Sequence, residues 1–270
     1  MTLKFEPLPM QEAIKFWGDK VPMSPSQFNR LTAEAKLKAF AVSGIAKGDN
    51  LATVYASLQR ALEQGISFEK FKEECGPIFE RRGWTGKWAW RVDNIFRTNI
   101  QTAYNVGRYK QMKEATATRP YWMYDAVNDR RTRPTHRALN GKVFPADHEF
   151  WSTWMPPNGF RCRCSVTSLS ARQAEKRGLK VESEIPQLIE PIDPTTGNKM
   201  PAVQLLPDTG FAYNPGESYW RGVEEALGQR IDTVWPEQVA AAVIADLAQE
   251  KELADLAGKL EKRLAARKRK

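Results

Sequence analysis

The sequence predicts an α+β protein, in which a helical N-terminal region precedes a small antiparallel β unit, an extended Pro-rich arm and a C-terminal helix. Apolar residues recur at intervals of three to four up to about residue 118, which is typical of helices. Short aromatic and alternating runs follow Pro120 and are typical of strands. Six of the seventeen prolines then lie between residues 180 and 216. We expect a helical segment at 1–48 and a main domain at 49–175. A Pro-rich arm at 176–235 and a basic helix at 236–270 should follow.

The composition is that of a folded protein. The chain has 270 residues, 41% hydrophobic and 27% charged, which allows a sizeable core. No apolar run approaches the ~20 residues that span a bilayer. The N-terminus carries Glu6 and Glu12 where a signal peptide would have an apolar run, so we expect none. Three cysteines cannot all pair, and a reducing compartment is therefore expected.

Positive charge is concentrated at the C-terminus. The formal net charge is +9, and the last twelve residues, KLEKRLAARKRK, hold seven Lys or Arg against one Glu. Such a tail predicts salt-sensitive, non-specific contact with the phosphates of double-stranded DNA. A solvated terminus that keeps the protein soluble is an equally good interpretation. The candidate DNA contacts are Lys262, Arg263, Arg267, Lys268, Arg269 and Lys270.

Residues typical of helix ends divide the N-terminal region. The stretch SPSQ at 24–27 is a capping box with proline in the first helical position. Residues 50–64 carry a clear apolar stripe, and Gly65 follows where a helix-ending glycine belongs. Ser67 can cap the next helix, which should continue to about residue 82. A long helix with a buried stripe that starts at Trp88 is expected over 84–115.

The pattern changes to that of strands after Pro120. The aromatic run at 121–127 predicts a strand. An Asn-Gly pair at 140–141 predicts a hairpin turn with a short strand after it. The alternating run at 161–169 predicts a strand that places Cys162 and Cys164 on one face. Together these runs predict a compact antiparallel unit.

The helix expected over 236–270 carries a narrow apolar seam. Such a seam suits a partner helix, in this chain or in another. Packing within its own domain is the favoured interpretation. The seam consists of Leu253, Leu256, Leu260 and Leu264.

Both histidines and two of the three cysteines lie in one short segment, which raises the question of a metal site. The weak candidate ligands are His136, His148, Cys162 and Cys164. Paired cysteines of structural zinc sites are usually two to four residues apart. Two thiolates on a tetrahedral zinc ion lie ~3.8 Å apart, whereas alternate residues of a strand have Cα atoms ~6.6 Å apart. We therefore favour two half-buried structural thiols, with no cofactor.

The turn before His136 carries acidic and basic side chains. Asp125 and Asp129 are expected to pair with one of the arginines at 130–133, and so to brace the turn. His136 is then expected to bond to a backbone carbonyl or a carboxylate. In this interpretation its role is structural.

Catalytic use of the segment is a weaker interpretation. A cysteine nucleophile would need an orienting histidine and an oxyanion hole, and a strand-centre thiol offers no evident one. A metal-dependent nuclease of the His-Asn-His type could use His136, Asn140 and His148, but the first two stand only four residues apart, which leaves no room for a hairpin. The many aromatic residues at 144–160 instead predict a β unit covered by aromatic loops. We expect no enzyme activity.

The stretch DRRTRPTHRALNGKVFPADHEFWSTWMPPNGFRCRCSV closely resembles the signature of the bacteriophage Mu F-like head morphogenesis domain. The likeness covers about residues 60–170, including the preceding helix, and a weaker likeness follows at 210–216. The residues that carry the signature are Asp129, Arg131, Thr132, His136, Gly141, Val143, Phe144, Pro145, His148, Phe150, Trp151, Pro156, Pro157, Asn158, Gly159, Cys162 and Cys164.

The resemblance implies a virion component and no catalytic residues. Members are minor head proteins of tailed phages that act in head assembly, usually beside the portal protein, and some associate with packaged DNA. The expected partners are the portal protein, capsid or scaffold proteins and double-stranded DNA, with no membrane during assembly. The expected location is the head interior or portal vertex, after assembly in the host cytoplasm. A head-borne toxin-like effector is an alternative, disfavoured because only the arm and the basic helix follow the signature.

Overall fold

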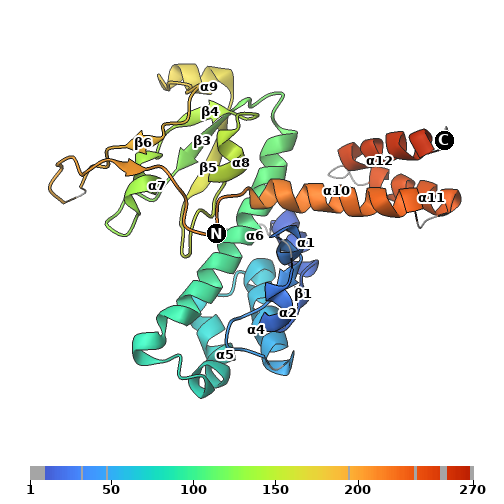
Figure 1. The fold of residues 1–270 in the computed structure, drawn as a ribbon, viewed down its shortest axis with the longest axis horizontal. Helices are drawn as coiled ribbons and strands as arrows, with labels where there is room; N and C mark the ends of the chain where they lie inside the picture. Colours follow the sequence, from blue (N-terminus) through green and yellow to red (C-terminus); the bar gives the residue numbers. More distant parts are fainter. Residues whose placement is uncertain are drawn as a thin grey trace, which may run out of the picture. The chain divides into compact units, whose positions relative to one another are not determined.

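The protein forms two compact units, which a computed structural model describes (Figure 1). The division falls after Glu217, inside helix α10 (Pro215–Thr233). The helices and small sheets of the protein confirm the expected α+β class. The structure describes residues 10–31, 33–46, 48–193, 195–233, 236–249 and 254–267.

The N-terminal part of unit 1 is helical, as expected. The capping box at Ser24 is confirmed, because its side chain accepts from the Gln27 amide and the Gln27 side chain reaches back. The helix that it begins is short, however, and ends at Asn29. The elements are α1 (Gln11–Gly18), α2 (Pro25–Asn29), α3 (Ala33–Leu37), α4 (Gly48–Gln64) and α5 (Phe68–Arg81), with a parallel pair of strands β1 (Val21–Pro22) and β2 (Ala39–Phe40).

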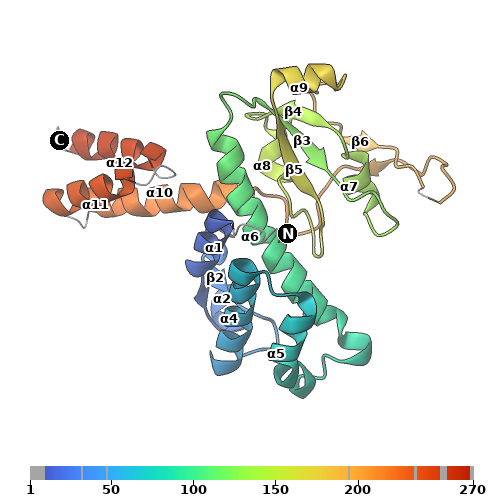
Figure 2. The ribbon, with the colours of Figure 1, turned by 180° about the vertical axis from the view of Figure 1, so that it is seen from behind.

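Helix α6 (Trp90–Glu114) connects the helical part of unit 1 to its sheet (Figures 1 and 2). On one side Gly107 lies against α1, close to the backbone nitrogen of Ala13. On the other side Gln101 donates to the carbonyl of Cys164 at 2.6 Å. Trp88, expected on the buried stripe, is 48% exposed, because it lies in the short 3-10 turn η1 (Gly86–Trp88) before the helix begins.

The sheet of unit 1 is antiparallel, in the order β4-β3-β5. Its strands are β3 (Tyr121–Asp125), β4 (Val143–Pro145) and β5 (Ser165–Leu169), and the connections carry α7 (Pro134–Ala138), α8 (Phe150–Trp154) and α9 (Ala171–Lys176). Two expectations about local structure are wrong. The residues before the Asn-Gly turn form helix α7 instead of a hairpin strand, and β5 begins four residues later than expected, after both cysteines.

Aromatic side chains from β3, β4 and α8 form the core beside this sheet. Phe144 stacks on Phe150 with ring centroids 4.1 Å apart, and Trp122 lies against Trp151 at 5.6 Å. All four rings are buried, since none is more than 2% exposed. Phe160 departs from the expectation, because it is 54% exposed. The expected cover of aromatic residues on the β unit is confirmed, but these residues lie in strands and in helix α8 and not in loops.

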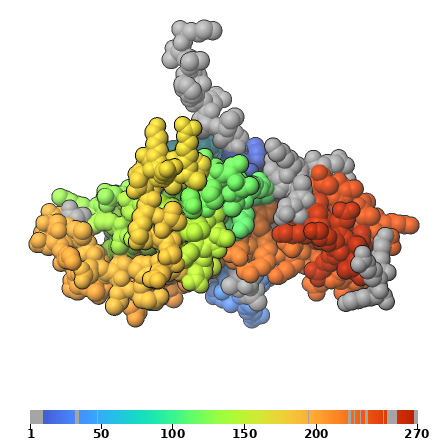
Figure 3. Space-filling model, turned by 90° about the horizontal axis from the view of Figure 1, so that it is seen from above, coloured from blue at the N-terminus to red at the C-terminus, as the bar shows by residue number. Residues whose placement is uncertain are grey.

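The Pro-rich segment runs over the β unit as a long arm. It carries a small antiparallel pair of strands, β6 (Leu188–Ile189) and β7 (Val203–Gln204). Near its end the amide of Asp208 donates to the carbonyl of Asn158 at 3.0 Å. In the space-filling view the arm (orange) forms the outer edge of unit 1 (Figure 3). The arm was expected to reach residue 235, but Pro215 already begins α10.

Unit 2 is a small helical unit made from the rest of α10 with α11 (Glu237–Gln249) and α12 (Ala254–Arg267). The single C-terminal helix that the sequence predicts is thus two helices. Leu260 and Leu264 pack with Ile231 and Ile244 in the core of unit 2, so the leucine seam packs within its own unit, as favoured. Leu253 lies outside the described residues. No helix among those described is long and apolar enough to cross a membrane.

Candidate functional site

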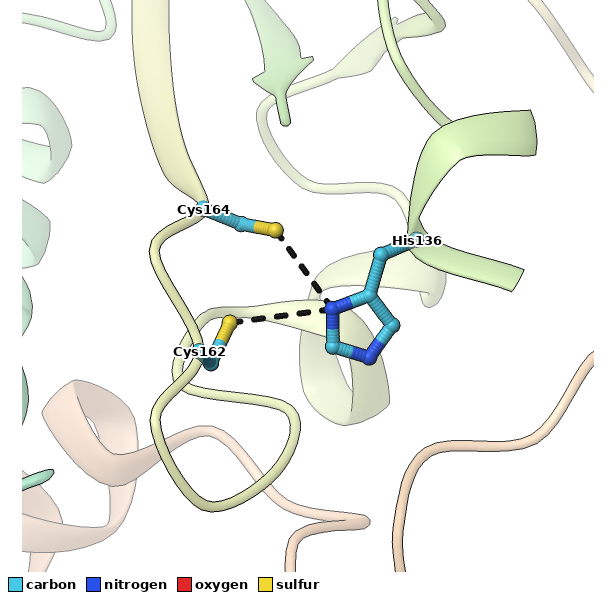
Figure 4. A group of neighbouring side chains, drawn as sticks. All are labelled: His136, Cys162 and Cys164. Atoms are coloured by element: carbon cyan, nitrogen blue, oxygen red, sulfur yellow. Dashed lines mark hydrogen bonds between the residues drawn. The ribbon is translucent and has the colours of Figure 1, made fainter. Parts of the chain in front are cut away.

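His136, Cys162 and Cys164 meet in the interior of unit 1 (Figure 4). The Nδ1 atom of His136 lies 3.7 Å from the Cys162 sulfur and 3.5 Å from the Cys164 sulfur. The two sulfurs and the ring nitrogen all lie within 4.8 Å of one another. The exposed fraction is 2% for His136, 3% for Cys162 and 2% for Cys164. We call these three residues the His-Cys-Cys cluster.

A bend in the backbone makes this cluster possible. Arg161 has a φ of 58°, in the left-handed region that non-glycine residues rarely adopt. The chain turns there, and regular strand geometry starts only at Ser165. The sequence-based argument against a shared ligand assumed a straight strand from Arg161, and this assumption is wrong. Both sulfurs can therefore point at one histidine.

Asn158 organises the loop that carries the cysteines. Its side-chain oxygen accepts a hydrogen bond from the Tyr124 hydroxyl at 2.9 Å, and the Asn158 residue is fully buried. Its side-chain NH₂ group donates to the carbonyls of Thr153 at 3.3 Å and Met155 at 3.4 Å. These contacts explain the asparagine in the Pro-Pro-Asn-Gly part of the signature. The sequence analysis did not single out Tyr124, because this residue lies in an ordinary aromatic strand outside the signature.

An ion pair fixes the same loop from its other side. The guanidinium of Arg163 donates two hydrogen bonds to the Asp129 carboxylate, at 2.7 and 2.6 Å. Asp129 was expected to pair within its own turn, but there it accepts only the backbone amide of Arg131 and the hydroxyl of Thr132. The Arg163 side chain holds the pKa of Asp129 well below its ordinary value. Asp125 instead accepts from Thr167 on the neighbouring strand.

The thiols of the cluster differ in acidity. A hydrogen bond from Cys164, aided by His136, lowers the pKa of Cys162 to about 4. The same bond and burial raise the pKa of Cys164 above its ordinary value. Burial and the two cysteines likewise raise the pKa of Tyr124.

His148 and Asn140 lie apart from the cluster. The Phe150 amide donates to Nδ1 of His148 at 3.1 Å, which leaves Nε2–H to donate to the carbonyl of Ser183 at 3.2 Å. Asn140 accepts from the backbone amide of Ala126 at 2.9 Å. Both ring nitrogens of His148 are thus engaged in hydrogen bonds. Among the described residues, His148 does not join His136 in a group of candidate metal ligands.

A basic cavity of about 370 Å³ opens beside the cysteine loop and was missed from the sequence. The signal was present, because four of the arginines that line the cavity lie inside the signature stretch, but their convergence depends on the fold. Asp93 pairs with Arg161 at 2.6 Å, and Asp208 pairs with Arg133 at 2.7 Å, so carboxylates offset part of the charge. The residues that line it are Arg97, Arg131, Arg133, Phe160, Arg161 and Arg163.

The candidate DNA contacts are only partly free. Arg263 pairs with Asp232 at 2.5 Å, and Arg267 donates to the carbonyl of Ile231, both within unit 2. Lys262 is exposed. Lys268, Arg269 and Lys270 lie outside the described residues.

The fold and the cluster define an α+β domain in which a loop of signature residues closes on a buried histidine. The family described as phage Mu protein F like protein matches residues 52–167, and this part of the chain belongs to that family. The match begins in α4 and ends in β5, so it contains all three residues of the cluster.

Two relatives extend the similarity beyond the family domain. The chain is 32% identical over 275 aligned positions to protein F of Escherichia phage Mu, whose name assigns it a proposed part in capsid assembly. The alignment covers 91% of this chain and 62% of that protein. A Mu-like prophage F protein of Haemophilus influenzae is also 32% identical, over 74% of this chain and 54% of its own length. The chain therefore spans under two thirds of either relative. No solved structure matches it.

Proposed function

We propose that this chain is a minor head protein of a tailed bacteriophage and acts in head morphogenesis. The observation that carries the proposal is the 32% identity to phage Mu protein F over 91% of this chain. That similarity extends well beyond the 52–167 domain, into the arm and the C-terminal helices. A shared role is a better explanation than a shared module alone.

A structural role, without catalysis, is part of the proposal. The His-Cys-Cys cluster is almost fully buried, so a large substrate has no access to it. Both nitrogens of His148 are engaged, which argues against its use as a metal ligand or a general base. The portal or the inner capsid is the proposed site of attachment, in keeping with the expected position of minor head proteins.

Contact with packaged DNA completes the proposal. Arg263 and Arg267 already bond within unit 2, so the exposed Lys262 and the last three basic residues are the proposed phosphate contacts. A short cationic segment of this kind binds any sequence, because phosphates carry no base information. Binding should therefore be weak and sensitive to salt.

The direct test removes the gene from the phage or prophage that encodes it and restores it from a plasmid. We expect the deletion to abolish infectious particles, with heads that are malformed or lack DNA in electron micrographs, and the full-length chain to restore both. A normal yield of DNA-filled heads without the gene would overturn the proposed role. A plasmid that expresses an unrelated phage gene controls for the effects of expression.

A further inference from the structure

We propose that Nδ1 of His136 and the sulfurs of Cys162 and Cys164 bind one zinc ion, which joins α7 to the loop before β5. The inference concerns the folded chain alone and does not depend on the proposed function. A thiolate–imidazole set of this kind suits zinc among the common divalent ions, whereas carboxylate-rich sets suit magnesium or calcium.

The distances agree with ligands on one small ion. With Zn–S bonds of ~2.3 Å and a Zn–N bond of ~2.0 Å in a tetrahedron, nitrogen and sulfur lie ~3.5 Å apart. The measured separations from the His136 nitrogen are 3.7 Å to Cys162 and 3.5 Å to Cys164. All three ligand atoms also lie within 4.8 Å of one another. Only small side-chain shifts would be needed to bind the ion.

Hydrogen bonding alone satisfies this cluster poorly. The Nδ1 atom has one lone pair or one proton, so it makes one good hydrogen bond, yet two sulfurs face it. With the ion on Nδ1, the proton lies on the buried Nε2, which has no hydrogen-bond partner among the described residues. An apolar pair of thiols would not need a buried histidine, whereas a metal ion uses all three groups at once.

Hydrogen bonds hold the loop that carries the two sulfurs. The Asn158 side chain accepts from the Tyr124 hydroxyl at 2.9 Å and donates to the carbonyl of Met155 at 3.4 Å. The Asp129–Arg163 pair holds the loop from outside without contacting the ligand atoms. Fixed surroundings of this kind commonly orient the ligands of a metal ion.

Three protein ligands leave a tetrahedral ion one further position. No other His, Cys, Asp or Glu of the described chain belongs to the group. We assign the fourth position to a water molecule. Because the ligands are at most 3% exposed, a large substrate could not reach the ion, which fits a stabilising role.

The test uses the full chain, expressed in zinc-supplemented medium and purified with a reducing agent and no chelator. Zinc per chain is measured by mass spectrometry of the metal, and cobalt(II) is added to metal-stripped protein as a spectroscopic probe. The chain provides matched controls. Cys75 is buried in α5, outside the cluster, and His148 lies in the same domain with its own partners. The test variants are Cys162→Ser, Cys164→Ser and His136→Gln, and the control variants are Cys75→Ser and His148→Gln.

We expect about one zinc ion per chain in the wild type and in both controls, and less than about a tenth of this in the three test variants. Cobalt should give the near-ultraviolet absorption of thiolate ligands with the visible bands of a tetrahedral ion. A wild-type chain with no zinc and no cobalt spectrum would overturn the proposal, as would a disulfide between Cys162 and Cys164 found under reducing conditions. Both wild-type measurements stand even if a test variant fails to fold.

Discussion

Arg163, which lies between the two clustered cysteines, donates two hydrogen bonds to the carboxylate of Asp129 at 2.7 and 2.6 Å. The pair connects the turn before α7 to the loop before β5, and these two segments supply the histidine and the cysteines. Planar two-point contact between guanidinium and carboxylate fixes orientation as well as distance. The acidic and basic residues of the signature therefore act by positioning the loop.

Replacing Asp129 by Asn should loosen this loop. The amide keeps the shape but lacks the charge, so Arg163 loses its charge-assisted bonds. We expect faster amide hydrogen exchange in peptides that cover residues 159–166, with little change elsewhere. Glu190→Gln, which removes the exposed ion pair with Lys199 at 2.6 Å, is the control and should leave those peptides unchanged. Unchanged exchange in the Asp129 variant would show that the pair does not hold the loop.

Gly107→Ala tests the contact between α1 and α6. A β-carbon at Gly107 would lie 2.8 Å from the sulfur of Met10 and 3.0 Å from the backbone nitrogen of Ala13, and the backbone cannot move aside easily. We expect a loss of ~1–3 kcal/mol in the free energy of unfolding, measured by urea titration. Gly76→Ala, in the middle of α5 with nothing within 4 Å of the added carbon, should be neutral or stabilising. Equal stability of the two variants would contradict the close packing.

Glu74 gives a prediction about pH. It accepts hydrogen bonds from Arg60 at 2.6 Å and from the buried Ser57 at 2.5 Å, and these bonds lower its pKa. The ionised form therefore stabilises the fold above the unfolded pKa of ~4.3, and this contribution is lost as the pH falls through the folded value. We expect Glu74→Gln to cost ~1–2 kcal/mol at pH 7 and progressively less below about pH 4.

The measurement for Glu74 is urea unfolding of wild type and variant over a series from about pH 7 to about pH 3. Glu73→Gln is the control, because Glu73 is 71% exposed and pairs with the exposed Lys70. Its effect should stay below about 0.5 kcal/mol. A cost for Glu74→Gln that does not change with pH would show that its ionisation is not what stabilises the native state.

The C-terminal basic residues should contribute to DNA binding through charge. Deleting residues 259–270 would also remove Leu260 and Leu264 from the core of unit 2, so point substitutions are the cleaner test. We expect a fourfold alanine variant to bind duplex DNA more weakly and to lower the slope of log K against log salt by about 3–4. The residues changed in this variant are Lys262, Lys268, Arg269 and Lys270.

The control for this variant changes four exposed cations of unit 1 to alanine. If both variants lower the salt slope equally, binding depends on overall charge and not on the tail. An unchanged affinity and slope in the tail variant would remove the proposed DNA contact. The control positions are Lys87, Lys113, Lys176 and Arg177.

Local rules predicted local structure well. The caps at Ser24 and Ser67 and the glycine after α4 lie where the sequence placed them, because cap geometry depends on a few neighbouring residues. Helix α10 was missed although its signal was readable. Asn214 caps it through the Glu217 amide at 3.0 Å, and Pro215 occupies the first turn. The density of prolines before it concealed that start.

The His-Cys-Cys cluster could not be derived from spacing alone. An Arg-Cys-Arg-Cys run has the period of a strand, and nothing in its sequence requires the left-handed backbone of Arg161. Arg161 itself makes tertiary contacts with α6, an ion pair with Asp93 at 2.6 Å and a hydrogen bond from its amide to Thr98 at 3.4 Å. The partner histidine lies 26 residues before Cys162, and only the folding of α7 onto the loop brings them together.

Counting this chain in purified phage particles tests the central claim most directly. Quantitative mass spectrometry against the major capsid protein gives the copy number per particle, in heads separated from free protein and empty debris. The proposed function predicts a few copies in each particle, far fewer than the major capsid protein. Absence from purified heads, both mature particles and assembly intermediates, would contradict it.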